Sequence, residues 1–496
     1  MLIFFYIILD CIFFTFVHFY KTDMGKRKVN RQNPIFLNDI TIEAAGAEGK
    51  ALARHEGKVI FMDFGAPGDV VDIKIHEKKQ SYCNATIIEI KEKSIDRVEP
   101  FCSHFGLCGG CKWQHLSYEA QLKFKQQQVH DAFERIGKFP FPELQSIVGP
   151  KNITHYRNKL EFSFTDRKWL DSMGDKETMA AHEHAGVGFH IPGRFDKILD
   201  VDICYLMDDL QNKIRHCLKD FAVANGFTFF NARSQEGFLR SMFVRNTSLG
   251  EWMVIIVFKE NNADDIQKMM QHVKESFPQL TSLLYIINDK RNDTIYDLDV
   301  HVFSGREYII EKLEDLTFHI QPKSFFQTNT EQTLTLYSHT RDFAGLTGEE
   351  TVYDLYTGVG SIANFVARNA KSVIGIESVE AAIEDAKVNA GLNNITNTHF
   401  YAGDMKDVLN DELIAKHGKA DVIITDPPRA GMHEDVVKKI MEMRPEKIVY
   451  VSCNPSTQAR DIAMFSDMYE VVKVQPVDMF PHTHHVENIA LLKLKN

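Results

Sequence analysis

The amino-acid sequence has no excess of positive charge and no repeated or low-complexity segment. Its 496 residues include 57 Lys and Arg against 68 Asp and Glu, so the formal net charge is −11. A protein that coats nucleic acid by bulk attraction needs the opposite balance, and this class is excluded. Any surface that binds nucleic acid must therefore be local.

Uninterrupted apolar runs of membrane-spanning length are also missing, although the N-terminus comes close to one. Met1–Val17 is nearly all apolar, but Asp10 interrupts it, and neither a basic segment nor a small-residue cleavage site accompanies it. Burying Asp10 in a bilayer would cost about 2.5–3.5 kcal/mol. We expect Met1–Asp23 to be an upstream extension from a misassigned start codon, with Met24 as the native beginning. A single-helix membrane anchor is the alternative.

Cysteine is scarce, with eight residues in the chain, yet Cys102, Cys108 and Cys111 stand close together. This grouping suits metal ligation better than the disulfide framework of a secreted protein. Cys204 is the expected fourth ligand. The spacing alone leaves structural zinc and an iron–sulfur cluster both open. Thiol ligands of this kind indicate a reducing, cytoplasmic compartment.

What is present has the composition of a globular protein, with 44% apolar and 25% charged residues, and the length favours about three domains. Short β-type runs between glycine turns predict a small N-terminal β-barrel. Alternating strands and helices near the C-terminus predict an α/β fold with a parallel, doubly wound sheet. We expect an extension over 1–33, the barrel over 34–100, a mixed α+β central domain over 101–321 and the α/β domain over 322–496.

A glycine turn and two acidic strand ends in the α/β domain predict a bound nucleotide-type cofactor. The strand Thr351–Tyr356 runs into Gly358-Val359-Gly360, where the backbone can approach a ligand closely. The next strand ends at Glu377, which can accept hydrogen bonds from ribose hydroxyls. A third ends near Asp404, placed to meet an adenine edge.

NAD and S-adenosylmethionine are the two cofactors that such a sheet could bind. Ala363 stands where the dinucleotide fingerprint has its third glycine, but alanine is tolerated there. The rigid Asp426-Pro427-Pro428 element at the carboxyl edge of the sheet favours S-adenosylmethionine. Arg429 follows instead of an aromatic residue, which disfavours methylation of an exocyclic amine and favours methylation of carbon.

Cys453 follows the apolar run Val449–Val451 at a strand end, where doubly wound folds carry out their chemistry. Methyl transfer to oxygen or nitrogen rarely needs a protein nucleophile, whereas transfer to an unreactive ring carbon such as C5 of uracil does. A lone cysteine at such a position is more often a buried small hydrophobe. Its neighbours therefore decide the interpretation.

Four motifs in this order resemble the RNA uracil-5 methyltransferase family, and specifically its 23S ribosomal RNA branch. They are Phe325-Phe326-Gln327-Thr328-Asn329, Asp426-Pro427-Pro428-Arg429, Ser452-Cys453-Asn454-Pro455 and His485-Val486-Glu487-Asn488. The resemblance covers nearly everything after residue 34. It implies that the barrel is a TRAM domain, an RNA-binding module, and that the last domain is a Rossmann-like, class I S-adenosylmethionine-dependent methyltransferase.

The resemblance also implies roles for individual residues. Cys453 matches the nucleophile that adds to C6 of uracil, and Glu487 matches the base that removes the C5 proton. The cysteine pattern is paired in this family with a [4Fe-4S] cluster. The family implies donor contacts from Gln327, Tyr356, Ser361, Glu377, Asp404 and Asp426. The contact from Ser361 departs from members that have Asn there.

A segment in the central domain is the best candidate for contact with RNA, because it mixes cations with an aromatic ring that could stack on an unpaired base. Its residues are Lys151, His155, Tyr156, Arg157, Asn158 and Lys159, with Arg167 and Lys168 nearby. A solvated strand edge is the alternative interpretation. Lys26, Arg27, Lys28 and Arg31 form a second, weaker candidate, a basic arm.

The sequence thus predicts a cytoplasmic, monomeric enzyme that methylates C5 of a uridine in 23S ribosomal RNA and needs no protein partner. A transfer-RNA uracil-5 methyltransferase is the nearest alternative, disfavoured by the cysteine cluster and the barrel. A non-catalytic RNA-binding factor is the alternative from another class. Intact Cys453, Glu487 and Asp426 weigh against it, because binding alone would not require all three.

Overall fold

The computed structural model describes residues 35–170 and 181–496, which divide into two compact units. The described part of the first unit comprises 35–101, Gly110–Phe124 and His482–His484, and the second unit comprises the rest. The expectations for Met1–Asp23 and for the basic arm lie outside the described residues. Among the helices that the structure describes, none combines the length and apolar character needed to cross a bilayer.

The first unit contains a six-stranded sheet in the order β1-β5-β6-β4-β3-β2. Its strands are β1 (Ile35–Thr41), β2 (Ala44–Ala45), β3 (Ala51–His55), β4 (Lys58–Met62), β5 (Val70–Lys78) and β6 (Tyr82–Glu92). Inward-facing side chains alternate along these strands and build one apolar core, as expected of a small barrel. Buried Asp69 accepts hydrogen bonds from the amides of Ala66 and Ser94 and from Nε of Arg97. These bonds and the guanidinium lower the pKa of Asp69, although its burial acts in the opposite direction.

The second unit begins with a seven-stranded sheet in the order β13-β12-β11-β10-β7-β8-β9. Its strands are β7 (Lys159–Thr165), β8 (Gly186–Ile191), β9 (Arg194–Asp200), β10 (Leu239–Asn246), β11 (Trp252–Phe258), β12 (Ser282–Ile287) and β13 (His301–Gly305). All pairs are antiparallel except β11 with β12, which α3 (Ala263–Ser276) connects. Helix α2 (Leu210–Ala224) packs against α3. The hairpin β14 (Ile309–Leu313) and β15 (Leu316–Ile320) follows.

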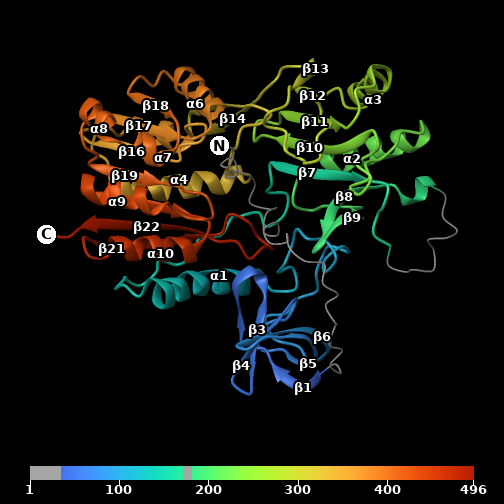
Figure 1. Ribbon diagram of the computed structural model, residues 1–496, viewed down its shortest axis with the longest axis horizontal. Helices are drawn as coiled ribbons and strands as arrows, with labels where there is room; N and C mark the ends of the chain where they lie inside the picture. The colour runs from blue at the N-terminus through green and yellow to red at the C-terminus, as the bar shows by residue number, and fades with distance from the viewer. Residues whose placement is uncertain (1–34, 171–180) are drawn as a thin grey trace, which may run out of the picture. The chain divides into compact units, whose positions relative to one another are not determined.

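The C-terminal sheet of the second unit has the order β18-β17-β16-β19-β20-β22-β21 (Figure 1). Its strands are β16 (Thr351–Leu355), β17 (Ser372–Glu377), β18 (Thr398–Ala402), β19 (Val422–Thr425), β20 (Lys447–Ser452), β21 (Tyr469–Val477) and β22 (Glu487–Leu494). The first five strands in the sheet order are parallel, and β22 runs antiparallel to both of its neighbours. This is the predicted Rossmann-like α/β sheet, and the central strands are buried because helices cover both faces.

The helices of this region connect the strands. They are α4 (Thr330–Ala344), α5 (Ser361–Ala367), α6 (Glu380–Leu392), α7 (Met405–Val408), α8 (Asp411–His417), α9 (Glu434–Met443) and α10 (Pro455–Phe465). One apolar core joins the sheet to α9, α10 and the C-terminal half of α1 (Tyr118–Ala132). Helices α4, α5 and α6 pack on the sheet outside that core.

A fully buried ion pair fixes the turn that precedes β22. Nζ of Lys125, on α1, donates to Oδ1 of Asp478 at 2.6 Å and to the carbonyl of Phe480 at 3.0 Å. Burial lowers the pKa of Lys125, and the carboxylate of Asp478 opposes that shift. Removing one member of such a pair leaves the other charge buried without its counter-charge.

We therefore expect Lys125→Met to lower the free energy of unfolding by about 3–5 kcal/mol, the usual effect of breaking a buried ion pair. Urea denaturation of the full-length protein, followed by tryptophan fluorescence, measures the change. Lys123→Met, which removes an exposed charge from the same helix, is the matched control and should differ little from wild type. Equal stability of the Lys125 and Lys123 variants would contradict a stabilising role for the pair.

Candidate active site

The predicted site residues follow strands that end at one edge of the C-terminal sheet. Leu355 pairs with Ile376 on one side and with Thr425 on the other, and Thr425 pairs with Tyr450. Because these strands are parallel, their carboxyl ends meet at the same edge, where doubly wound sheets bind ligands. Tyr356, Glu377, Asp426 and Cys453 are the residues at or just after these ends.

The antiparallel strand β22 brings Glu487 to the same edge. Ser452, the last residue of β20, pairs with Asn488 in β22. Cys453 is the residue after Ser452, and Glu487 is the residue before Asn488. In this antiparallel register the two residues lie opposite each other on adjacent strands. The Glu487 side chain is buried, and Cys453 is partly exposed. The register thus places a thiol and a buried carboxyl next to each other at the edge where the parallel strands end.

The loop after β19 is tied to both of these residues. The carbonyl of Arg429 accepts hydrogen bonds from Nδ2 of Asn454 at 3.0 Å and from Oγ1 of Thr457 at 3.1 Å. Its guanidinium Nη2 lies 2.9 Å from Nδ1 of His485. Asn454 follows Cys453 directly and His485 lies two residues before Glu487, so one loop holds both segments. The contact between Arg429 and His485 could not be predicted from local sequence patterns.

The glycine turn after β16 matches what a nucleotide-type cofactor requires. Gly358 has φ +55° with open space where a Cβ would lie, so a ligand can approach its backbone closely. Gly360 has φ +73°, and a Cβ there would come within 2.8 Å of Cβ of Ala386. The carboxylate of Glu377 accepts hydrogen bonds from the amides of Gly358 and Val379 at 3.2 and 3.0 Å. These residues suit S-adenosylmethionine.

Two other predicted donor contacts stand at helix starts. Asp404 is the N-cap of α7 and accepts a hydrogen bond from the amide of Lys406 at 3.2 Å, and its side chain is exposed. Ser361 is the first residue of α5, and its hydroxyl lies 2.8 Å from the hydroxyl of Tyr337. Gln327 is buried just before α4.

Tyr337 is a site residue that the sequence does not single out, because a tyrosine on a helix with apolar neighbours resembles core. It is buried on α4. Burial raises its pKa, and the carboxylates of Asp426, Asp354 and Glu487 raise it further. Its hydroxyl therefore lies within electrostatic reach of both the donor side and the proposed base, and it stays protonated at neutral pH.

Asp354 is a second residue that the sequence does not single out. It lies in the middle of β16, fully buried, and accepts a hydrogen bond from the hydroxyl of Thr357. Burial raises its pKa to about 7, with a further contribution from the carboxylate of Glu377. Because Thr357 directly precedes Gly358, this hydrogen bond connects Asp354 to the start of the glycine turn.

The segment proposed for RNA contact mostly supports the site, and the hypothesis is wrong for Tyr156 and Arg157. The hydroxyl of Tyr156 donates to the carbonyl of Pro481 at 3.0 Å, and the Arg157 guanidinium lies 5.2 Å from the ring centre of Phe480. Nδ2 of Asn158 donates to the carbonyl of Gln327 at 2.9 Å. Tyr156 and Arg157 are buried and cannot stack on a base. The exposed residues of the segment are Lys151, Asn152 and His155.

The predicted metal ligands fall in both units. Cys111 belongs to the first unit, and Cys102, Cys108 and Cys204 belong to the second. Cys204 is buried, which raises its pKa; a nearby Cys102 also raises it, whereas Arg157 and Arg215 lower it. Burial likewise raises the pKa of Cys102.

Buried polar side chains from the start of α2 hold the backbone around Cys204. Oδ1 of Asn212 accepts hydrogen bonds from the Cys204 amide at 2.9 Å and from Nη2 of Arg215 at 3.1 Å. Nε2 of Gln211 donates to the Cys204 carbonyl at 3.0 Å. Arg215 also donates to the carbonyls of Val201 and Asp202. A buried guanidinium beside a buried thiol suits a thiolate-bound centre, whose negative charge it would offset.

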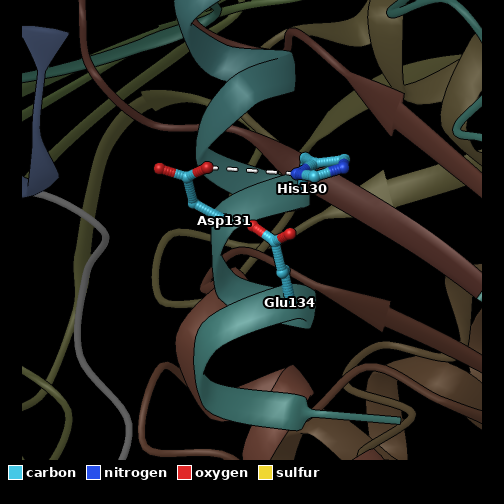
Figure 2. Close-up of side chains that lie close together, drawn as sticks. All are labelled: His130, Asp131 and Glu134. Carbon is cyan, nitrogen blue, oxygen red and sulfur yellow. Dashed lines mark ion pairs between the residues drawn. The ribbon is translucent and has the colours of Figure 1, made fainter. Parts of the chain in front are cut away.

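Another group of possible ligands lies on the surface of α1 and the turn after it. The ligand atoms of His130, Asp131 and Glu134 all lie within 4.8 Å of one another (Figure 2). Nη2 of Arg135 approaches the Asp131 carboxylate at 3.3 Å, one helical turn away. All three side chains are at least partly exposed, and the Asp131 carboxylate already pairs with the guanidinium of Arg135. The group therefore has the character of a surface ion-pair cluster.

Comparison with known proteins agrees with this geometry. The profile of the tRNA (uracil-5-)-methyltransferase family matches residues 117–495, and that of the TRAM domain matches residues 38–88. Two uncharacterized RNA methyltransferases are similar over 90% of the chain. The one from Bacteroides thetaiotaomicron is 54% identical over all of its own length, and the one from Porphyromonas gingivalis is 51% identical over 97%.

A solved structure is also similar. The Pyrococcus abyssi tRNA (uracil-54, C5)-methyltransferase in complex with S-adenosyl-L-homocysteine aligns with a TM-score of 0.70 and 30% identity. The alignment covers 92% of this chain and 100% of the other. The family match and the identities confirm the resemblance seen in the sequence. The chain is a member of the tRNA (uracil-5-)-methyltransferase family, an S-adenosylmethionine-dependent RNA methyltransferase with an N-terminal TRAM domain.

Proposed function

We propose that the protein methylates C5 of a uridine in 23S ribosomal RNA through a temporary bond between Sγ of Cys453 and C6 of the base. The adjacent positions of Cys453 and Glu487 at the end of β20 and the start of β22 are the observation that carries this proposal. A reaction at an unactivated ring carbon needs a nucleophile on one atom and a base for the proton of the next, and these two residues supply both.

The steps follow from the chemistry of the two side chains. The Cys453 thiolate adds to C6, and the electron pair of the C5–C6 double bond moves to C5. S-adenosylmethionine, when bound, supplies the electrophilic methyl group that C5 accepts. Glu487 then removes the C5 proton, the double bond re-forms, and the C6–S bond breaks to return the thiolate. Glu487 is buried, so a general base at this position is shielded from bulk water.

The remaining residues of the site have supporting roles in the proposal. Asp426 and Arg429 would hold the pyrimidine or polarise its carbonyl, and the contact of Arg429 with His485 keeps this loop beside Glu487. The target base must leave its stack to enter, at a cost of a few kcal/mol unless it is already unpaired. The donor would be held by Gln327, Tyr356, Ser361, Glu377, Asp404 and Asp426.

Transfer RNA is the second candidate substrate, because the similar Pyrococcus abyssi enzyme is a tRNA (uracil-54, C5)-methyltransferase. That alignment covers 92% of this chain and all of the other. The preference for ribosomal RNA rests on the branch that the four sequence motifs resemble. Only a direct comparison of the two RNAs decides between them.

We expect tritium release from RNA containing 5-tritiated uridine, dependent on S-adenosylmethionine, and abolished by Cys453→Ala. Glu487→Gln should slow release by roughly 10²–10⁴-fold and accumulate a covalent protein–RNA adduct, because the methylated base cannot lose its proton. Cys217→Ala, which changes a cysteine outside the site, should release tritium at the wild-type rate. Release from 23S fragments supports the proposal, and release from transfer RNA alone moves the protein to the second candidate. Release by Cys453→Ala would refute the covalent route.

The second part of the proposal is that Cys102, Cys108, Cys111 and Cys204 bind a [4Fe-4S] cluster. Two observations support this proposal. Asn212 accepts a hydrogen bond from the backbone amide of Cys204, and the charges of Arg157 and Arg215 lower the pKa of the Cys204 thiol against the effect of burial. The cluster would link residues 102–111, which follow the barrel in sequence, to Cys204 in the central domain. We therefore propose that its role is structural or that it positions the RNA.

Anaerobically purified protein should then contain about four irons per chain and absorb visible light. Cys204→Ser should lose most of the iron, because it removes one ligand, whereas Cys217→Ser should keep it. Iron, acid-labile sulfide and zinc are measured on the same samples. Zinc without iron in the wild-type protein would contradict the cluster.

The pKa of Asp354 predicts a dependence of stability on pH. Its pKa is raised from 3.8 to about 7 on folding, so it stabilises the fold below pH 4 relative to higher pH, and this contribution is lost as the pH rises through 7. Asp354→Asn has no such dependence. We expect the unfolding free energy of the variant, relative to wild type, to increase between pH 4 and 8 by at most about 4 kcal/mol. Denaturation curves at several pH values test this, and parallel stability profiles would contradict it.

A further inference from the structure

The β8–β9 hairpin exposes an aromatic ring. The hairpin is distant in sequence from the residues of the candidate active site. In β9, Arg194 pairs with Ile191 of β8, but the next pair joins Ile198 to His190. The three residues between them form a bulge. Phe195 lies in this bulge, and 70% of its surface is exposed. Bulges are a common means of turning a side chain out of the sheet.

The hairpin is rigid where the bulge begins. Its turn contains Pro192, whose φ is fixed, followed by Gly193 with φ +72°. Gly109 lies against the turn, because a Cβ there would come within 3.2 Å of the His190 carbonyl and 3.6 Å of Pro192. The turn before Phe195 is thus constrained before any partner binds. This constraint lowers the conformational entropy that the ring would lose on binding.

Cations lie on the strand that carries this ring and on two segments bonded to it. Arg194 and Lys197 are its neighbours in β9. Lys168 lies beside β9, because it forms a bridge with Ile198 and the next residue's amide donates to the Ile198 carbonyl. Arg233 reaches in from the loop before β10, where its Nε donates to Asp196 at 2.6 Å.

Charges of both signs lie on the segments that meet at this hairpin. The cations are Arg167, Lys168, Arg194, Lys197 and Arg233; the carboxylates are Asp166 and Asp196, each paired with an arginine, and Glu183, Asp200 and Glu236. Arg194 is exposed and forms no ion pair with any residue in the described ranges. Next to the exposed ring of Phe195, Arg194 therefore offers a charge that can contact a phosphate.

We propose that Phe195 and the cations around it bind an unpaired stretch of the RNA substrate outside the catalytic pocket. Phe195 stacks on one base, and Arg194 with its neighbours contacts the phosphates on either side. This combination of an aromatic platform and a cationic surround is how proteins hold single-stranded nucleic acid. The proposal rests on the proposed function only in taking RNA as the substrate.

A protein partner is the less suitable occupant. Pairing with an added strand needs free backbone groups along an edge, and Trp169 already donates its amide to the Ile198 carbonyl on that side. Arg194 and Lys197 flank the ring in β9, whereas protein interfaces have an apolar centre with few charges. Both features favour a polyanion.

The test is the affinity of the full-length protein for a fluorescent, unpaired RNA of roughly 16 nucleotides, the upper site size of known single-strand binders, measured by anisotropy at several salt concentrations. Phe195→Ala should weaken binding by about 5- to 150-fold, the effect of losing one base–aromatic stack, with the salt dependence unchanged. Phe195→Trp should bind as wild type. Arg194→Gln should reduce the slope of log K against log salt by about 0.7. Leu249→Ala, which truncates an exposed apolar residue in the loop between β10 and β11, is the control.

Equal affinities for Phe195→Ala and Leu249→Ala would overturn the proposal. So would a Phe195→Ala variant that binds RNA normally but sediments differently from wild type, since this would identify a protein contact. Tritium release by Phe195→Ala at saturating RNA should match wild type, because the residue lies outside the site. If the wild-type protein releases no tritium while Phe195→Ala still binds RNA more weakly, the proposed reaction fails and the surface stands.

Discussion

The pairing of β22 between β20 and β21 is the interaction on which the candidate site depends. The five parallel strands and their loops are enough to present a glycine turn, the carboxylate of Glu377 and the thiol of Cys453. They do not include a base. Only the antiparallel strand, in the register that pairs Ser452 with Asn488, adds Glu487 beside the thiol. A slip of one residue would turn Glu487 to the opposite face of the sheet.

Buried polar contacts hold the loops around this pairing. The ion pair of Lys125 with Asp478 and the hydroxyl of Tyr156 hold the turn before β22, and Asn158 holds the backbone of Gln327. The donors of Lys125, Tyr156 and Asn158 each reach an acceptor, which matters because unpaired buried groups are costly. One short segment, residues 156–158, thus contacts both the turn that leads to the proposed base and the loop on the donor side.

The elements with strong local patterns could be predicted from the sequence. Runs of β-branched residues marked the strands of the barrel and of the C-terminal sheet, and the glycine turn marked the donor side. The position of Cys453 after a buried strand was also predictable, because only local sequence determines it. The chain's membership of an RNA uracil-5 methyltransferase family followed from motifs rather than from composition.

Contacts between distant segments could not be predicted in this way. Tyr337 has an ordinary core pattern, and only its position opposite Ser361 and the site carboxylates distinguishes it. Asp354 is one polar residue in an apolar strand, and its raised pKa comes from burial that sequence does not report. Tyr156 and Arg157 resembled RNA contacts because cations and aromatics occur together on RNA-binding surfaces, yet the same residue types also fill polar gaps inside proteins.

The position of β22 has a consequence for how the enzyme would lose activity on heating. It lies next to β21, the edge strand of the sheet, whereas the donor side is formed by β16 and β17 near the opposite edge. Edge hairpins open at lower free energy than central strands, because fewer neighbours hold them. Partial opening of β21 and β22 would separate the proposed base from the thiol while the donor side stays folded. Inactivation can therefore precede the cooperative melting of the sheet, leaving a protein that still retains its cofactor.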